Sequence, residues 1–442
     1  MGQPANARLT PEITREVCQR TGSTTALDGS IARIGTRYNV ILKAVNCVDG
    51  DLLASTEAQA VDKSHVLDAL GDVASEMRKR LGESLSTVQK YNTPLEQATT
   101  PSLEALQAYS LGFQNWRGGK NIATLPFFER AIQLDPKFAM AFWAIGTAYA
   151  YLGETALSSE NMRKAFALRA GVSQRERMVI ETDYYNFVTG DLRKARGVCE
   201  IGARTYPHDF FFHLDLGGFA NSFGEYESGL EEYLKALRLD PYNSILYRMV
   251  VYTYLLSGQV ARAEATAAEA QAKGLGFDLA PILYEIAFYH GDTAQMGREL
   301  ARAGNKPGGE DLLLALQADT AAYFGHLKQA QKLSREAAES AERAGEEETA
   351  AGYRAVSALR EALFGNKASA RQQVVIGRKH SVGRDTDYGF ALALVYAAET
   401  GGAQALTDDL SKRFPEDSGM QLSYLPTLRK VGARRCKSSA GP

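Results

Sequence analysis

A pattern that returns roughly every 34 residues constrains this chain more than any other feature of its sequence. A helical segment that ends in Ala-x-x-Leu is followed by Asp-Pro at residues 135–136 and again, at the same phase, at residues 240–241. Glycine or alanine at the eighth and twentieth positions lets two helices pack closely, and proline ends the second helix before the next unit begins. Such a hairpin buries its apolar face only by stacking on its neighbours. The sequence therefore predicts a tandem array of helical hairpins.

The pattern resembles the tetratricopeptide repeat, and we expect about nine helical hairpins within residues 103–425. The match is closest in residues 105–277, whereas the later copies keep the glycine and alanine but lose the proline. The residues that carry the pattern in the clearest copies are Leu111, Gly112, Phe128, Ala131 and Pro136; Phe142, Ile145, Gly146, Tyr149, Met162 and Ala165; Gly190, Ala195 and Pro207; Leu216, Gly217, Tyr233, Ala236 and Pro241; and Tyr254, Gly258, Ala263 and Ala270. The resemblance implies a mostly α-helical solenoid.

Residues 8–82 follow a different pattern, which predicts a small N-terminal α/β domain. Three segments with a period of two are separated by turn signals at residues 35–36 and 49–50, so three antiparallel strands are expected. Helical spacing precedes and follows the strands, and the expected order is α-β-β-β-α.

The two helices of this domain have recognisable ends. The first is expected over residues 8–22, with Thr10 as its N-cap, and the second over residues 65–81, with Ser64 as its N-cap. The proline- and threonine-bearing segment 83–102 is expected to be the linker to the repeats.

Composition excludes several classes of function. A net charge of -2 over 442 residues provides no global field that would collect nucleic acid or anionic membrane. No run approaches the roughly 18 apolar residues that a membrane span requires. The cysteines are far apart, without a C-x-x-C pair, so neither zinc nor a dense disulfide framework is indicated; they are Cys18, Cys47, Cys199 and Cys436. Buried thiols are the favoured interpretation, and a Cys18–Cys47 bridge is the alternative.

Three long segments, together with the repeats, resemble the C-terminal regions of bacterial transmembrane serine/threonine kinases that end in tetratricopeptide repeats. These segments are LTPEITREVCQRTGS at residues 9–23, LDGSIARIGTRYNVILKAVNCVDGDLLA at residues 27–54 and LGESLSTVQKYNTPLEQATTPSLEALQAYSLG at residues 81–112. In such kinases the catalytic domain and a membrane helix come first, and this region lies beyond the membrane. The resemblance also implies an additional strand and helix before Leu9, so we expect Met1 to be an internal methionine and the α/β domain to be truncated.

The sequence alone favours a cytoplasmic protein, because Met1 is followed by neither a charged nor an apolar leader segment. If the chain belongs to a longer membrane-bound kinase, the expected location is instead the extracytoplasmic side of the inner membrane.

No motif for catalysis, cofactor binding or metal binding is present in the sequence. There is no glycine-rich dinucleotide loop over a strand, no P-loop, no kinase catalytic loop and no H-E-x-x-H, and the 6 histidines are scattered among different repeats. We therefore expect a protein that is not an enzyme and that uses no cofactor.

The inner, concave face of the first five repeats is rich in aromatic side chains. Trp, Tyr and Arg are the residue types that most often anchor protein interfaces. The predicted partner-binding residues are Tyr109, Phe113, Trp116, Trp143, Tyr151, Tyr184, Phe187, Phe211, Arg248 and Tyr252. Packing between hairpins is the alternative role for each of them. Tetratricopeptide domains that clamp a peptide carboxylate resemble this one in fold and use lysine and asparagine at inner positions. Those positions are not basic here, so an apolar or amphipathic ligand is expected instead.

The leading functional hypothesis is a scaffold that binds a peptide or protein partner through this face. The alternative is a sensory or scaffolding fragment of a membrane-bound serine/threonine kinase. Residues 426–442 have no apolar period and are expected to form an irregular basic tail.

Overall fold

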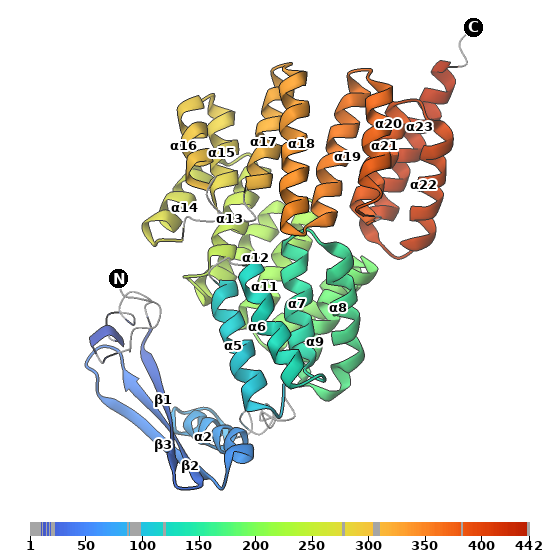
Figure 1. Cartoon of the computed structure of the whole chain (residues 1–442). Helices are drawn as coiled ribbons and strands as arrows, with labels where there is room; N and C mark the ends of the chain where they lie inside the picture. The colour runs from blue at the N-terminus through green and yellow to red at the C-terminus, as the bar shows by residue number, and fades with distance from the viewer. Residues whose placement is uncertain are drawn as a thin grey trace. The chain divides into compact units, whose positions relative to one another are not determined.

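A computed structural model describes most of the chain, namely residues 23–85, 99–117, 121–275, 279–303, 310–381 and 383–439 and the single positions 10, 12–14, 16, 18 and 88. This part is mostly helical, with a three-stranded antiparallel sheet near the N-terminus (Figure 1). It divides into two compact units, which are Met1–Ser110 with Arg130–Ala139 and Leu168–Glu176, and Leu111–Glu129 with Met140–Ala167 and Arg177–Pro442. The predicted fold class is confirmed.

The sheet contains β1 (Thr25–Ile34), β2 (Arg37–Asn46) and β3 (Leu52–Ala60) in sequence order. Alternation along β2 directs Val40 and Ala44 toward α2 (Val66–Arg80), where they are buried with Val73 and Met77 of that helix. The three strands and the following helix were expected from their periods, and they form as predicted.

The start of α2 differs from the prediction. A short 3-10 helix, η1 (Lys63–His65), precedes it, and the carboxylate of Asp62 accepts hydrogen bonds from the backbone N–H groups of Ser64 and His65. Asp62 is therefore the N-cap of this segment, and Ser64 is not. The Ser64 hydroxyl instead donates a 2.6 Å hydrogen bond to the Asp62 carboxylate.

Strand β1 is an edge strand that α2 leaves uncovered. Leu27 is 61% exposed and Ile31 is 50% exposed, although both are opposite buried residues of β2 in the register. The helix packs on β2 and β3 instead. The apolar face of β1 is thus open to solvent within the described residues.

A disulfide joins Cys18 to Cys47, so the interpretation of both as free buried thiols was wrong. Residues 12–14, 16 and 18 are helical, in agreement with the first predicted helix, and the rest of that helix lies outside the described residues. Cys199 is a buried free thiol, as expected. The predicted linker, 83–102, lies largely outside the described residues.

The helices from α5 to α22 form nine successive pairs in the part of the chain that the structure describes, and α23 follows them. Their bounds are α5 (Leu103–Arg117), α6 (Asn121–Leu134), α7 (Ala139–Tyr151), α8 (Thr155–Leu168), α9 (Gln174–Tyr184), α10 (Leu192–Thr205), α11 (Phe210–Ser222), α12 (Tyr226–Leu239), α13 (Ser244–Leu256), α14 (Val260–Ala272), α15 (Ala280–His290), α16 (Thr293–Ala303), α17 (Glu310–Tyr323), α18 (Leu327–Ala344), α19 (Glu347–Leu363), α20 (Lys367–Gly377), α21 (Arg384–Tyr396), α22 (Thr400–Arg413) and α23 (Leu425–Ser439). This is the tetratricopeptide architecture that the repeats predicted.

The glycine at the eighth position of a repeat is required by close packing inside the hairpin. A Cβ atom placed on Gly112 would lie 2.4 Å from the ring of Phe128, and one on Gly217 would lie 2.7 Å from the ring of Tyr233. Any larger residue would push the two helices apart and open a gap in the apolar contact. The sequence pattern therefore reports a real steric constraint.

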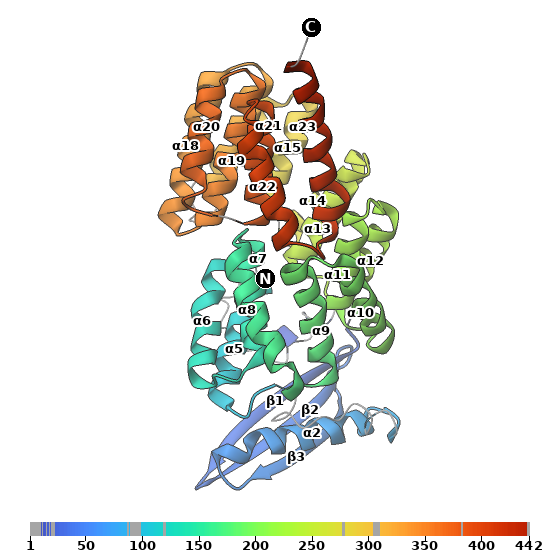
Figure 2. The ribbon, with the colours of Figure 1, turned by 90° about the vertical axis from the view of Figure 1, so that its right-hand side faces the viewer.

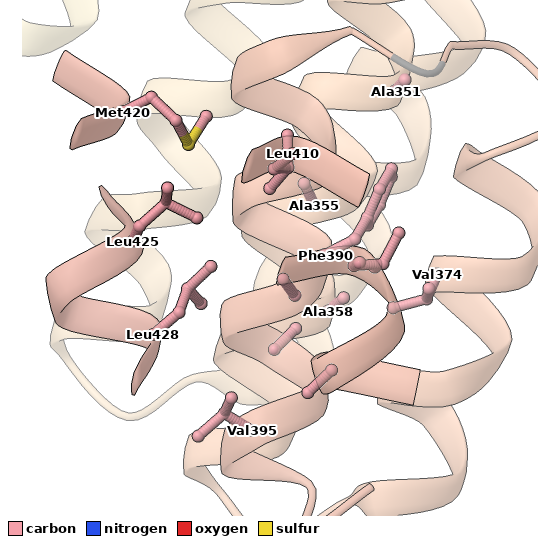
Figure 3. Close-up of a cluster of buried hydrophobic side chains, with 14 residues drawn as sticks. Ala351, Ala355, Ala358, Val374, Phe390, Val395, Leu410, Met420, Leu425 and Leu428 are labelled. Atoms are coloured by element: carbon pink, nitrogen blue, oxygen red, sulfur yellow. The ribbon is translucent and has the colours of Figure 1, made fainter. Parts of the chain in front are cut away.

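Residues 425–439 are helical, whereas the sequence predicted an irregular tail from residue 426 onward. Leu425 and Leu428 on α23 are buried beside Met420, in a cluster that also contains Phe390 and Leu410 (Figure 3). This burial fixes the first turn of α23. The following lysine, arginine and alanine residues are good helix formers, so the helix continues without an apolar period of its own.

Candidate binding site

Four of the predicted inner-face residues form one aromatic cluster, which we call the ring core: Phe113 and Trp116 on α5, Trp143 on α7 and Phe211 on α11. The ring centres of Phe113 and Trp143 are 6.2 Å apart, those of Trp143 and Phe211 are 5.5 Å apart, and those of Trp116 and Phe211 are 5.8 Å apart. The four rings lie together although they come from three different helices.

The two tryptophans of the ring core are enclosed by the chain itself. Trp116 is 3% exposed and Trp143 is 2% exposed. The indole Nε1 of Trp143 donates a hydrogen bond of 2.6 Å to a carboxylate oxygen of Asp183 on α9. Both side chains therefore pack between repeats in this structure and offer no surface to a ligand.

The carboxyls of the buried Asp183 and the half-buried Asp215 lie close enough for the charge of one to affect the other. Burial raises the pKa of Asp183, and the bond from Trp143 opposes part of that rise. Burial and then the nearby charge of Asp183 raise the pKa of Asp215 well above its ordinary range. Two carboxylates that repel one another in a region of low dielectric favour keeping a proton at neutral pH.

Six predicted residues lie outside the ring core, and five of them are Tyr151, Tyr184, Phe187, Arg248 and Tyr252. Arg248 stacks over the ring of Tyr151, with its guanidinium carbon 5.7 Å from the ring centre. Tyr184 stacks on Phe166 at 3.8 Å. Tyr252 is 44% exposed, and Phe187 is half-buried at the edge of a large cavity.

Tyr109 completes the predicted set. Its ring lies 4.9 Å from that of Phe138, and burial raises the pKa of its hydroxyl. Both observations indicate packing for this tyrosine.

The large cavity exists because distant parts of the repeat array meet. Figures 1 and 2 show the end of α7 next to the start of α19. The carboxylate of Glu154 accepts hydrogen bonds of 3.1 Å from the backbone N–H groups of both Glu348 and Thr349, in the first turn of α19. In return, the carboxylate of Glu348 accepts a 3.0 Å bond from the N–H of Ala156 and a bond from the Thr155 hydroxyl, in the first turn of α8. Each glutamate caps the helix that carries the other one.

A second set of contacts joins the segment before α10 to the segment before α23. The carbonyl of Gly190 accepts a 2.9 Å hydrogen bond from the N–H of Ser418, and the Ser418 hydroxyl accepts a 3.1 Å bond from the N–H of Leu192. Gly190 has a φ of 68°, and a Cβ atom there would lie 2.0 Å from a carboxylate oxygen of Asp417. Only glycine fits at this point. We call the two sets of contacts together the closure.

The space between the closure contacts is a cavity of about 1170 Å³, which we call the closure cavity. Its wall includes apolar side chains from both sides of the closure, among them Phe187, Leu192 and Phe414, and several charged side chains. The cavity is slightly larger than the roughly 300–1,000 Å³ of typical small-molecule pockets, and its wall is both apolar and charged.

Sequence reasoning found Phe187 and Gly190 but missed Glu154, Glu348 and Asp417. A glutamate directly after a glycine at a helix start also occurs at residues 224–225 and 345–346. The local sequence around Glu154 is therefore no different from that of an ordinary helix start, and only the tertiary contact distinguishes it.

Comparisons with known proteins add only architectural likeness. No protein-family model and no curated protein sequence matches the chain. PilW, described as a widely conserved type IV pilus biogenesis factor, is 19% identical with a TM-score of 0.33, over 49% of this chain and 99% of its own. A thermophilic TPR protein of Thermus thermophilus is 20% identical with a TM-score of 0.31, over 45% of this chain and 98% of its own. PilF of Pseudomonas aeruginosa is 15% identical with a TM-score of 0.30, over 49% of this chain and 97% of its own.

At such identities and TM-scores the likeness carries no inference about what this chain binds. Among the helices of the described ranges, none is both long enough and apolar enough to cross a bilayer.

Proposed function

We propose that this chain is a non-enzymatic scaffold that binds a peptide or protein partner at the inner side of its repeat array. The observation that supports the proposal best is the closure cavity, whose wall contains Phe187 of the predicted inner face. Aromatic side chains at the edge of a concave surface are frequent anchors of partners. Tyr151, Tyr184, Arg248 and Tyr252 are proposed to extend the surface, while Trp116 and Trp143 hold its shape from beneath.

Because Trp116 and Trp143 are buried, the proposed contact site differs from the one expected from the sequence, while the proposed function stays the same. An interface anchor must be reachable from solvent before the partner arrives, unless the array opens. We therefore propose that the partner contacts mainly the half-buried Phe187 and its neighbours, and not the ring core. A tetratricopeptide array provides many such inner positions, and its rigid stacking holds them in a fixed arrangement.

The experiment uses the full chain as bait, with crosslinking, followed by purification of the captured partner and a titration with the isolated proteins. Phe187→Ala should weaken that affinity by roughly tenfold or more, the scale of an interface hot spot. Phe364→Ala is the matched control, because Phe364 is 53% exposed and does not line the cavity. Equal affinities for the native chain and Phe187→Ala, with circular dichroism unchanged, would refute this binding site.

We propose as a second candidate that the chain is the sensory or scaffolding part of a membrane-bound serine/threonine kinase, on the extracytoplasmic side. The Cys18–Cys47 disulfide favours this location, since disulfides persist in oxidising compartments and are rare in the cytosol. Reading the genomic sequence upstream of the Met1 codon provides the test. An in-frame kinase domain and membrane helix would support this candidate, and a stop codon directly upstream would rule it out.

A further inference from the structure

The closure cavity contains more unpaired positive charge than negative charge. Its wall includes five permanently charged cations, Arg163, Arg378, Lys379, Arg384 and Arg413, and four carboxylates, Glu154, Glu347, Glu348 and Asp417. The net charge that a ligand experiences in the cavity depends on which of these side chains already pair with other residues of the chain.

The four carboxylates all have partners. Glu154 and Glu348 accept the N–H groups at the starts of the two capped helices, and for Glu348 these bonds oppose part of the rise in pKa that burial causes. Asp417 pairs with Arg384 at 2.6 Å and accepts a 2.8 Å bond from the N–H of Met420. Glu347 pairs with His380 at 2.6 Å. None of these oxygens needs a ligand cation.

Three of the cations are also neutralised. Arg378 and Arg413 share the buried carboxylate of Asp387, and Arg384 pairs with Asp417 and with Asp385. The charge of each is thus held by a carboxylate of the chain.

Arg163 on α8 and Lys379 after α20 are different. Both side chains are exposed, and neither forms a hydrogen bond or an ion pair with any described residue. They belong to opposite sides of the closure. Two unpaired cations in the wall of one concave, partly apolar space raise its positive potential.

We propose that the closure cavity takes an acidic, amphipathic segment of a partner protein, whose carboxylates pair with Arg163 and Lys379 while its apolar side chains contact Phe187 and Leu192. This inference rests on the proposed scaffold function and specifies the partner's chemistry. Arg163 offers a carboxylate two parallel N–H donors, and Lys379 adds a point charge. The site differs from a carboxylate clamp, because neither cation is at an inner position of helix A of its repeat.

The probe is a fluorescently labelled synthetic peptide rich in glutamate and leucine, compared with the same peptide in which glutamine replaces every glutamate. Fluorescence anisotropy with the full chain should show the glutamate peptide binding roughly tenfold more tightly or better, with an affinity that falls as salt is added. Equal affinities for the two peptides would overturn the inference.

Charge variants locate the site. Arg163→Glu/Lys379→Glu and the milder Arg163→Gln/Lys379→Gln should each remove most of the preference for the glutamate peptide. The control, Lys332→Glu/Arg335→Glu, makes the same charge change on the exposed face of α18, at residues that do not line the cavity. An equal loss in the control would show attraction by net charge only and would overturn the proposed site.

The same variants separate this inference from the proposed function. If the natural partner is weakened by Phe187→Ala but not by either charge variant, the scaffold function stands and the acidic segment is refuted. If neither substitution affects the partner, both proposals fail.

Discussion

Trp143 provides the sharpest test of whether the inner aromatic residues serve packing or binding. Its indole is 2% exposed, contacts Phe113 and Phe211, and donates to Asp183 at 2.6 Å. Truncating a buried aromatic to alanine costs about 3–5 kcal/mol. Trp143→Phe keeps a ring in place but leaves the Asp183 carboxyl without this donor, which costs about 1–3 kcal/mol. We therefore expect the free energy of unfolding to fall in the order native, Trp143→Phe, Trp143→Ala.

The pH dependence gives this prediction a second, independent readout. Burial already raises the pKa of Asp183, and the Trp143 bond lowers it, so Trp143→Phe should raise that pKa further. A carboxyl whose pKa is higher in the folded state than in the unfolded state contributes stability at acidic pH, and that stability is lost as pH rises through the folded-state pKa. Trp143→Phe should thus cost more at pH 8 than at pH 5, and Asp183→Asn should abolish the difference.

Urea unfolding followed by circular dichroism at both pH values, on the full chain, measures these effects. The array need not unfold in one step, so hydrogen exchange of α7 and α9 accompanies the urea curves. An unchanged unfolding curve for Trp143→Ala, together with a loss of partner affinity, would show that Trp143 is an interface residue. Equal costs of Trp143→Phe at the two pH values would refute the assigned role of Asp183.

Three further predictions concern the closure, a buried carboxyl and the disulfide. Glu154→Ala and Glu348→Ala should each lower the free energy of unfolding by about 1–2 kcal/mol. They should also speed hydrogen exchange in the first turn of α19 and of α8, respectively. Unchanged exchange there would contradict the reciprocal caps. Burial, followed by the charges of neighbouring carboxylates, raises the pKa of Glu346 from 4.5 to about 7. Glu346→Gln should therefore stabilise the protein by on the order of 2–3 kcal/mol at pH 8 and little at pH 5. A larger gain at pH 5 than at pH 8 would show that the pKa of Glu346 is not raised by folding. Reducing the Cys18–Cys47 bond, which spans 29 residues, should destabilise the α/β unit by roughly 3–4 kcal/mol and leave the helical signal of the repeats intact. A count of four free thiols before any reductant is added would contradict the bond.

Sequence reasoning succeeded where the determining contacts are local. Gly112 and Gly217 recur at one phase because each meets an aromatic ring of the next helix, so the repeat could be recognised from spacing alone. It failed for α23, whose first turn is fixed by the burial of Leu425 and Leu428 against the preceding helices α21 and α22. The inner face is an intermediate case. The residues were placed correctly on their helices, but the enclosure of Trp143 depends on how far α11 approaches α7, which no local pattern encodes.

The closure also restricts how this array can evolve. Solenoids commonly gain or lose whole repeats, because each hairpin contacts only its neighbours and an inserted copy lengthens the stack without disturbing it. Here the bond from the N–H of Glu348 to Glu154 spans 194 residues, so it depends on the summed rotation and rise of every hairpin between α8 and α19. One duplicated hairpin would carry the first turn of α19 past Glu154 and leave both buried carboxylates without their N–H donors. Among relatives that keep the closure, the number of repeats between these helices should therefore be fixed, while their surface residues remain free to vary.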